Sequence, residues 1–96
     1  MRVMKVKVRS LAGFRHILGG DREVDLAEGA RIEDLLQDLC AAEGGQGLRP
    51  LLFDAGGLKG DVNILVNGRN VESLQGLQTE LAEGDDVALF PAAIGG

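Results

Sequence analysis

The 96-residue sequence has neither tryptophan nor tyrosine, and it contains one cysteine and one histidine. A single cysteine, Cys40, excludes an internal disulfide framework and suits a reducing compartment. His16 and Cys40 are 24 positions apart, and without a second soft ligand they cannot form a zinc site. The sequence therefore predicts neither a disulfide-stabilised fold nor a metal centre.

An excess of positive charge and a long apolar run are also missing. Fifteen acidic residues against ten basic ones give a net charge of -5, which disfavours nucleic acid or anionic membrane and favours a basic protein surface as partner. The N-terminus, "MRVMKVKVRS", has no signal-peptide core, and no apolar run could span a bilayer. We expect a cytoplasmic protein.

Motifs for catalysis are scarce as well. His16 has no serine or cysteine nucleophile at a suggestive spacing, so we interpret it as a solvated loop histidine. Cys40 continues an apolar helical stripe, which is typical of a buried structural thiol. The glycine clusters at residues 44–47 and 56–57 lack the lysine and hydroxyl residues of a phosphate loop.

An acidic set near the C-terminus allows more than one interpretation. It consists of Glu80, Glu83, Asp85 and Asp86. Paired carboxylates could perform acid-base chemistry, but solvated charge in a turn is the interpretation we favour. The same charges could steer a basic partner toward the nearby end of the chain.

The apolar pattern predicts one α+β domain with the order β-β-α-β-β. Alternation indicates strands at residues 4–8 and around Val24 and Leu26, after a glycine-rich loop. A stripe from Ile32 to Cys40 predicts the main helix, stopped by Gly44 and Gly45. Residues 46–61 should form an irregular crossing with a short strand at residues 51–53.

The C-terminal half should supply the remaining strands. Alternation predicts a strand at residues 62–66, a tight turn at Asn67 and Gly68, a return strand at 69–71, and a last strand at 86–90. If Val62, Ile64, Val66, Val87 and Leu89 face the core, Leu65 and Phe90 face outward. These two side chains would form an apolar docking patch, unless a loop covers them as a second small core. Together with Pro91 they are the residues that we expect to contact a partner.

The chain ends "ALFPAAIGG", and the part after Pro91 is uncharged and aliphatic. We expect residues 1–91 to form the domain and residues 92–96 a flexible tail. A carboxylate that follows two residues without side chains could slide along a narrow channel in another protein. Chemistry at that carboxylate would need activation, for example adenylation by ATP.

The segments "ILVNGRNV" and "LAEGDDVALFPAAIGG" resemble the small subunit of molybdopterin synthase, the thiamine sulfur carriers and the small archaeal ubiquitin-like modifiers. The similarity extends through the first strand and "VDLAEGARIEDLL". It implies a ubiquitin-like β-grasp fold, in which a mixed sheet of four or five strands curls over one main helix. By position, Gly95 and Gly96 match the diglycine of this family, and Phe90 and Pro91 match its strand-to-tail exit.

The resemblance also implies a function. Gly96 would be adenylated by an ATP-dependent activating enzyme and converted to a thiocarboxylate, while Ile94 and Gly95 enter a partner's active site. The protein would bind no cofactor and would not itself be an enzyme. It would donate sulfur as the non-catalytic subunit of a synthase complex, together with the large subunit of molybdopterin synthase or another sulfur acceptor.

Three alternatives stay open on the sequence. The molybdopterin branch commonly has a second proline after Pro91, where this chain has Ala92, so the sulfur could instead serve thiamine synthesis or tRNA thiolation. The activated Gly96 could also be conjugated to lysines, as in a ubiquitin-like protein modifier. Finally, the protein could be a plain interaction module whose tail is incidental.

Overall fold

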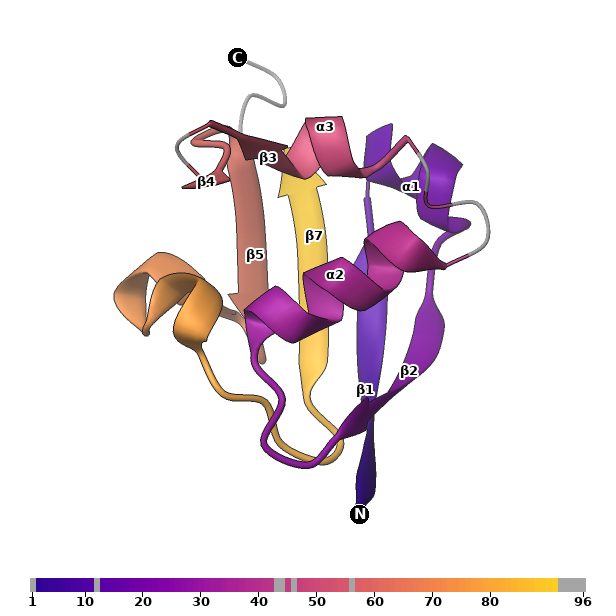
Figure 1. The fold of residues 1–96 in the computed structure, drawn as a ribbon, viewed down its shortest axis with the longest axis vertical. Coiled ribbons are helices and arrows are strands. Elements are labelled where there is room, and N and C mark those ends of the chain that lie inside the picture. The colour runs from indigo at the N-terminus through magenta and orange to yellow at the C-terminus, as the bar shows by residue number, and fades with distance from the viewer. Residues whose placement is uncertain (1, 12, 43–44, 46, 56, 92–96) are drawn as a thin grey trace.

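The computed structural model describes residues 2–11, 13–42, 45, 47–55 and 57–91 (Figure 1). The strands of the main sheet are β1 (Val3–Ser10), β2 (Arg22–Ala27), β5 (Val62–Val66), β6 (Arg69–Asn70) and β7 (Asp86–Pro91). The helices are α1 (Gly13–Leu18), α2 (Ile32–Ala41) and α3 (Arg49–Leu52), with 3-10 turns η1 (Val71–Ser73) and η2 (Gly76–Gln78). A small separate hairpin joins β3 (Phe53–Asp54) to β4 (Gly57–Leu58).

The main sheet is mixed and five-stranded, in the order β2-β1-β7-β5-β6. The pair β1 and β7 is parallel, and the other neighbouring pairs are antiparallel. With one principal helix packed on it, this arrangement confirms the predicted α+β fold and its mixed sheet. The last strand lies in the middle of the sheet, between β1 and β5.

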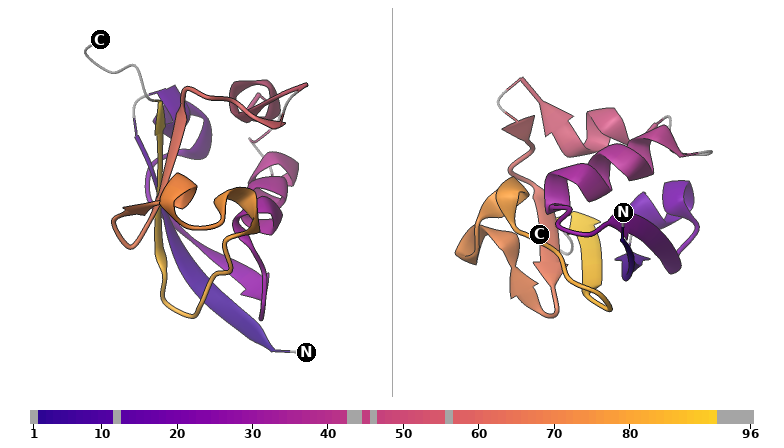
Figure 2. Two further views of the ribbon diagram at one scale, coloured as in Figure 1. Left: turned by 90° about the vertical axis from the view of Figure 1, so that its left-hand side faces the viewer. Right: turned by 60° about the horizontal axis from the view of Figure 1, so that its bottom comes forward.

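One face of the sheet is covered and the other is open. Along β1 and β5, residues alternate between buried and more exposed positions, as period-two alternation predicts. Figure 2 (left) shows the sheet nearly edge-on, with α2 and α3 on one side. The core therefore lies between this side of the sheet and the helices.

Helix α2 supplies four side chains to that core. Ile32, Leu35, Leu36 and Leu39 are all buried and recur at the spacing of one helical face. In the first turn, Asp34 accepts a hydrogen bond from the backbone N–H of Arg31 at 2.9 Å, which satisfies one unpaired donor at the helix start. No helix among the described residues is long and apolar enough to cross a membrane.

The glycine-rich segment after β1 was predicted to be a loop, and this was wrong. It contains helix α1, whose Phe14 and Leu18 are buried in the core. The helix spans six residues, so it is too short for a clear helical period, and glycines at both ends resemble loop punctuation. Burial of two large apolar side chains explains why the segment folds.

Two short strands also differ from expectation. Within residues 51–53, Leu51 and Leu52 complete α3, and only Phe53 is in a strand, where it pairs with Leu58. The return strand ends at Asn70 because its side chain accepts a hydrogen bond from the backbone N–H of Glu72 at 2.9 Å. This contact caps the turn η1, which begins at Val71.

The predicted tight turn between β5 and β6 is confirmed. Asn67 and Gly68 have φ angles of 51° and 87°, the left-handed values that such a hairpin requires. The Asn67 side chain also donates to Asp85 at 2.9 Å and accepts from the backbone N–H of Asp86 at 3.0 Å. One asparagine thus joins this turn to the start of β7.

Substituting Asn67 tests how much the turn depends on its positive φ angle and on its two side-chain hydrogen bonds. We expect Asn67→Ala to lower the free energy of unfolding by about 1–2 kcal/mol, because alanine disfavours positive φ and makes neither hydrogen bond. Asn67→Gly loses the hydrogen bonds but keeps the backbone freedom, so it should cost less. Urea denaturation followed by far-ultraviolet circular dichroism suits this tryptophan-free chain. Equal losses in the two variants would contradict the backbone argument.

Candidate functional site

The chain leaves the described fold at the end of β7. The final pairing of this strand joins Val62 to Pro91, and β1 flanks its other side through the pair Ser10 and Leu89. Proline has no N–H to donate, so it suits the end of a strand. Because β7 is a central strand, the chain continues beyond Pro91 from the middle of the sheet and not from one of its outer strands. Ile94, Gly95 and Gly96 lie outside the described residues, and their roles stay predictions.

The predicted orientation of the last strands is confirmed. Val87 and Leu89 are buried, whereas Ala88 and Phe90 lie on the open face with partial exposure, as does Leu65. The register places Leu65 opposite Ala88 and Asn63 opposite Phe90, so Leu65 and Phe90 are diagonal neighbours. Both are half-exposed rather than fully exposed.

A further apolar residue belongs to this surface. Leu11 follows β1 and is 44% exposed, and its backbone N–H donates to the carbonyl oxygen of Leu89 at 3.0 Å. Because Arg9 lies beside Ala88 in the parallel register, the alternation places Leu11 beside Phe90. Sequence reasoning missed Leu11, although the alternation from Lys5 onward could have been extended to it. We call Leu11, Leu65, Ala88 and Phe90 the sheet patch.

Polar groups surround the sheet patch. The open face is hollowed beside Leu65 and Ala88, where the lining also includes Arg9, Asn67, Gly68 and Asp86. Arg9 pairs with Asp86 at 2.7 Å across the parallel strands. An apolar centre with a charged margin is the usual composition of a protein–protein contact surface.

A second ion pair lies farther along the same face. Lys5 donates to Asp25 at 3.1 Å, and this hydrogen bond raises the pKa of the Lys5 ammonium. Both side chains are well exposed, so the pair contributes little to stability. The open face between β1 and β2 is thus polar at Lys5 and Asp25, and Val3 is an exposed apolar side chain near the start of β1.

The acidic set has a structural role in three of its members. Glu83 accepts from the Lys5 backbone N–H at 3.2 Å, Asp85 accepts from the Ala82 N–H at 2.8 Å, and Asp86 pairs with Arg9. The turn containing Asp85 also lies at the beginning of β7, whereas the chain leaves at its end. The strand β7 separates Asp85 and Asp86 from Pro91 by about 17–20 Å. Steering of a basic partner by these charges stays a prediction.

The single histidine and the single cysteine lie on different helices. His16 is exposed as predicted, but it lies on α1 and not in a loop. Cys40 lies on α2 and is half-buried, less than the buried position predicted for it. No group of three or more histidine, cysteine or acidic side chains among the described residues could hold a metal ion.

Partial burial raises the pKa of the Cys40 thiol, and the nearby charge of Arg49 opposes this effect only in part. Less thiolate is then present at pH 8 than in a free cysteine. We expect iodoacetamide to alkylate Cys40 several-fold more slowly in the folded protein than in urea, and the rate to keep rising at higher pH. Mass spectrometry follows the reaction, and equal rates in the two states would contradict this account.

Comparison with known proteins agrees with this geometry. The model of the ThiS family matches residues 8–96. Small archaeal modifier protein 3 of Haloferax volcanii is 38% identical over 96 residues, covering 97% of this chain and all of the relative. Sulfur carrier protein CysO of Mycobacterium tuberculosis is 36% identical over 96 residues with the same coverage.

A solved structure extends the similarity to three dimensions. The Pyrococcus furiosus protein named "putative molybdopterin converting factor, subunit 1" has a TM-score of 0.71 and 35% identity, with 92% of this chain and 97% of that one covered. The family match spans nearly the whole chain and includes the strand that ends at Pro91. The chain belongs to the ThiS family, within the superfamily of ubiquitin-like β-grasp sulfur carriers.

Proposed function

We propose that this protein carries sulfur as a thiocarboxylate on Gly96. An ATP-dependent activating enzyme joins the Gly96 carboxylate to the α-phosphate of ATP, and pyrophosphate leaves. A sulfur nucleophile then attacks the carbonyl carbon and displaces AMP. The carboxylate needs the first step because it is a poor electrophile, and AMP is a far better leaving group than oxide.

The observation that carries this proposal is the position of Pro91. It ends a strand that is paired on both sides, next to the sheet patch and followed by an uncharged aliphatic segment. A partner that binds the open face through Phe90 and Leu65 would have the tail directed into its own interior. Catalytic groups and ATP would belong to that partner, and this chain would be a substrate that binds no cofactor.

Molybdopterin synthesis is the pathway we favour for the sulfur. The Pyrococcus furiosus structure carries a name from that pathway and shares 35% identity with this chain. The sulfur acceptor would then be the large subunit of molybdopterin synthase, which completes a synthase complex. Ala92, where a second proline is common in that branch, keeps thiamine synthesis and tRNA thiolation as alternative destinations.

Conjugation to other proteins is the second candidate. The Haloferax volcanii relative is named a modifier, and it matches this chain over its whole length. The same acyl-adenylate would be attacked by a lysine amine in place of sulfur, which forms an isopeptide bond and releases AMP. The two functions share their first step and diverge only in the nucleophile.

The shared step is tested by ATP–pyrophosphate exchange with the activating enzyme of the same host. We expect exchange to depend on the wild-type protein and to vanish with a variant that lacks Gly96. Adding sulfide should then give the thiocarboxylate, because hydrosulfide displaces AMP without any change of oxidation state, whereas lysine-bearing acceptor proteins would give conjugates if the chain is a modifier. No exchange with the wild type would contradict both candidates and leave an interaction module.

A further inference from the structure

A small depression lies beside the end of β7, on the side of the sheet opposite the sheet patch. It is lined by Phe14, Leu51, Lys59, Asp61, Val62 and Pro91. Pro91 and Val62 are cross-strand partners, and their side chains point to the helix-covered side. The end of β7 is therefore bordered by apolar surface on both sides of the sheet.

Exposed apolar residues gather at this end of the molecule. Among the described residues, the large apolar side chains with high exposure are Val3 at 62%, Leu11 at 44% and Leu51 at 41%. Leu11 adjoins Phe90 on the open face, and Leu51 lines the depression on the other side. Only Val3 lies at the opposite end, near the start of β1 (Figure 1).

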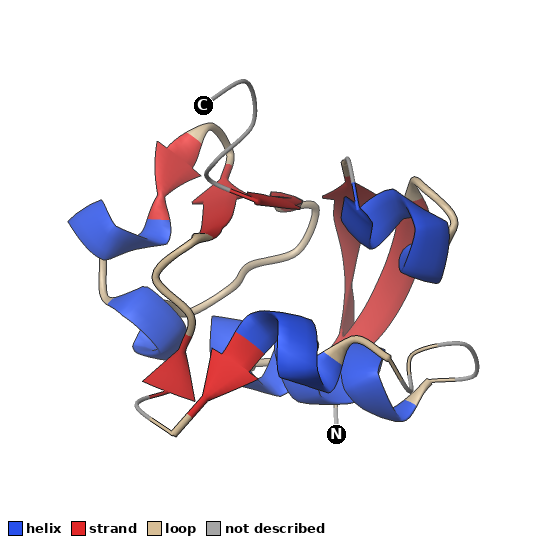
Figure 3. Ribbon diagram, turned by 90° about the horizontal axis from the view of Figure 1, so that it is seen from above, coloured by secondary structure: helices blue, strands red, loops and turns tan. Residues whose placement is uncertain are grey.

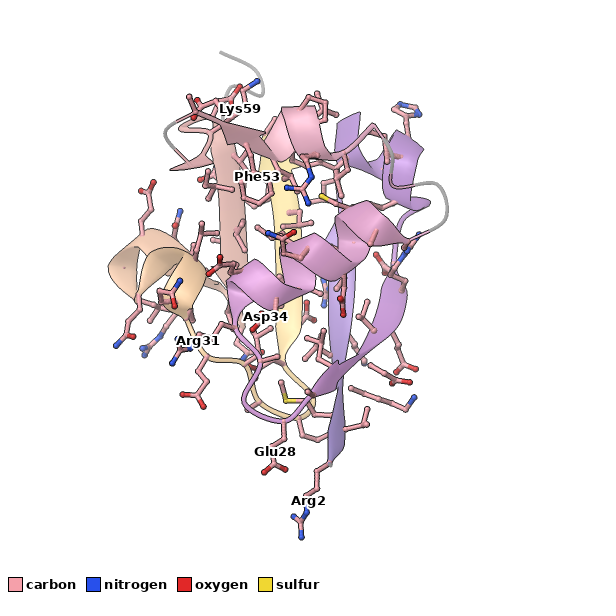
Figure 4. The ribbon with its side chains drawn as sticks, in the orientation of Figure 1. Arg2, Glu28, Arg31, Asp34, Phe53 and Lys59 are labelled. Atoms are coloured by element: carbon pink, nitrogen blue, oxygen red, sulfur yellow. The ribbon has the colours of Figure 1, made fainter. Side chains whose placement is uncertain are left out.

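Charged groups form the margin of the depression. Figure 4 shows Lys59 at this end of the molecule, far from Arg2 at the other. The Lys59 ammonium donates a long hydrogen bond of 3.4 Å to the Pro50 carbonyl oxygen, and the residue is half-buried. An apolar floor with a charged margin suits one apolar side chain of a protein partner, with polar groups around it.

The length of the tail decides which partner can reach this surface. Residues 92–96 separate Pro91 from the carboxylate, and fully extended they span at most about 18 Å. An enzyme that encloses the Gly96 carboxyl in its interior must bring the rim of its channel close to Pro91. The end of the molecule at which β7 finishes faces the viewer in Figure 3. Phe90 of the sheet patch and Pro91 of the depression are the last residues of that strand, so the rim would lie against both.

We propose that the ATP-dependent activating enzyme places an apolar side chain in this depression, with Leu51 as a specificity-determining contact. This inference rests on the proposed function and extends the interface to the helix-covered side of the sheet. Contacts on both sides of the sheet at the end of β7 would fix the direction of the tail relative to the enzyme. Contacts on the open face alone would restrain that direction from one side only.

The substitution Leu51→Glu tests the proposal. We expect Leu51→Glu to raise the KM for this protein in ATP–pyrophosphate exchange about tenfold with kcat little changed, because a buried charge opposes docking and not chemistry. Val3→Glu is the matched control, with the same charge placed on an exposed apolar position at the far end, and its KM should equal that of the wild type. Leu51→Met keeps the apolar contact and should behave like the wild type.

The outcomes separate this inference from the proposed function. Thermal melts monitored by circular dichroism establish that the variants are folded, and Leu51→Ser replaces the glutamate variant if that one is unstable. A wild-type KM for Leu51→Glu or Leu51→Ser, with normal exchange, would overturn the second contact and leave the carrier proposal intact. No exchange with wild-type protein would overturn the carrier proposal and, with it, this contact.

Discussion

Gly95→Val is expected to reduce kcat/KM for adenylation by at least about 100-fold, because two branching methyl groups obstruct the extended tail inside a narrow channel. The reacting carbonyl belongs to the next residue, Gly96, so even a displacement of about 1 Å would misplace it relative to ATP. The fold should be unaffected, since position 95 follows the last strand. ATP–pyrophosphate exchange measures the effect.

Gly47→Val is the matched control for this substitution. A Cβ atom at Gly47 would meet the Cδ1 atom of Ile17 at 3.9 Å, an ordinary van der Waals contact, and the position does not have a positive φ angle. The same change of residue there should leave kcat/KM within about twofold of the wild type. Equal activity of Gly95→Val and wild type would contradict a channel that admits only glycine, and would favour an interaction module with an incidental tail.

Phe90→Asp is expected to raise the KM for the activating enzyme about 30-fold, the effect of losing an aromatic contact worth about 2 kcal/mol. Phe90 is half-exposed beside Leu11 and diagonal to Leu65, so the aspartate would put a charge in the middle of the sheet patch. Because the residue faces away from the core, stability should fall only slightly. Steady-state exchange kinetics separate KM from kcat.

Val3→Asp provides the control, since Val3 is on an exposed position of β1 far from the sheet patch. Leu65→Asp should weaken binding in the same direction as Phe90→Asp, and the double variant should lose less than the sum because both act on one contact. A KM unchanged by Phe90→Asp in a folded protein would mean that partners approach the tail without using the open face.

Much of the fold could be predicted because its signals are local. The stripe of Ile32, Leu35, Leu36 and Leu39 repeats over more than two helical turns, so its period is unambiguous. Asn67 and Gly68 are the residue types that adopt positive φ most easily, and their turn was predicted correctly. Where the period extends over several residues, sequence and structure agree.

Short elements depended on contacts that the sequence does not display. Helix α1 spans six residues between glycines, and its burial depends on the core beneath Phe14. Leu52 is buried as the end of a four-residue helix, although the same letters suit a strand. In such segments tertiary packing decides the conformation, because neither period has room to appear.

The candidate site shows the same division. Alternation was enough to place Phe90 and Leu65 on one face, because strand geometry fixes the side of every second residue. The depression could not be predicted, because Phe14, Leu51 and Val62 come from separate elements that meet only in the folded chain. Asp85 is also only six positions before Pro91 along the sequence, but the length of β7 separates the two residues.

The central claim is that Gly96 carries sulfur, and the intact mass of the untagged protein purified from its own host tests it most directly. We expect a fraction in which one oxygen has been exchanged for one sulfur, mapped by fragmentation to the last residue and absent from a variant without Gly96. The claim would be contradicted if every molecule had an unmodified carboxylate, whether or not the protein was also found in isopeptide conjugates.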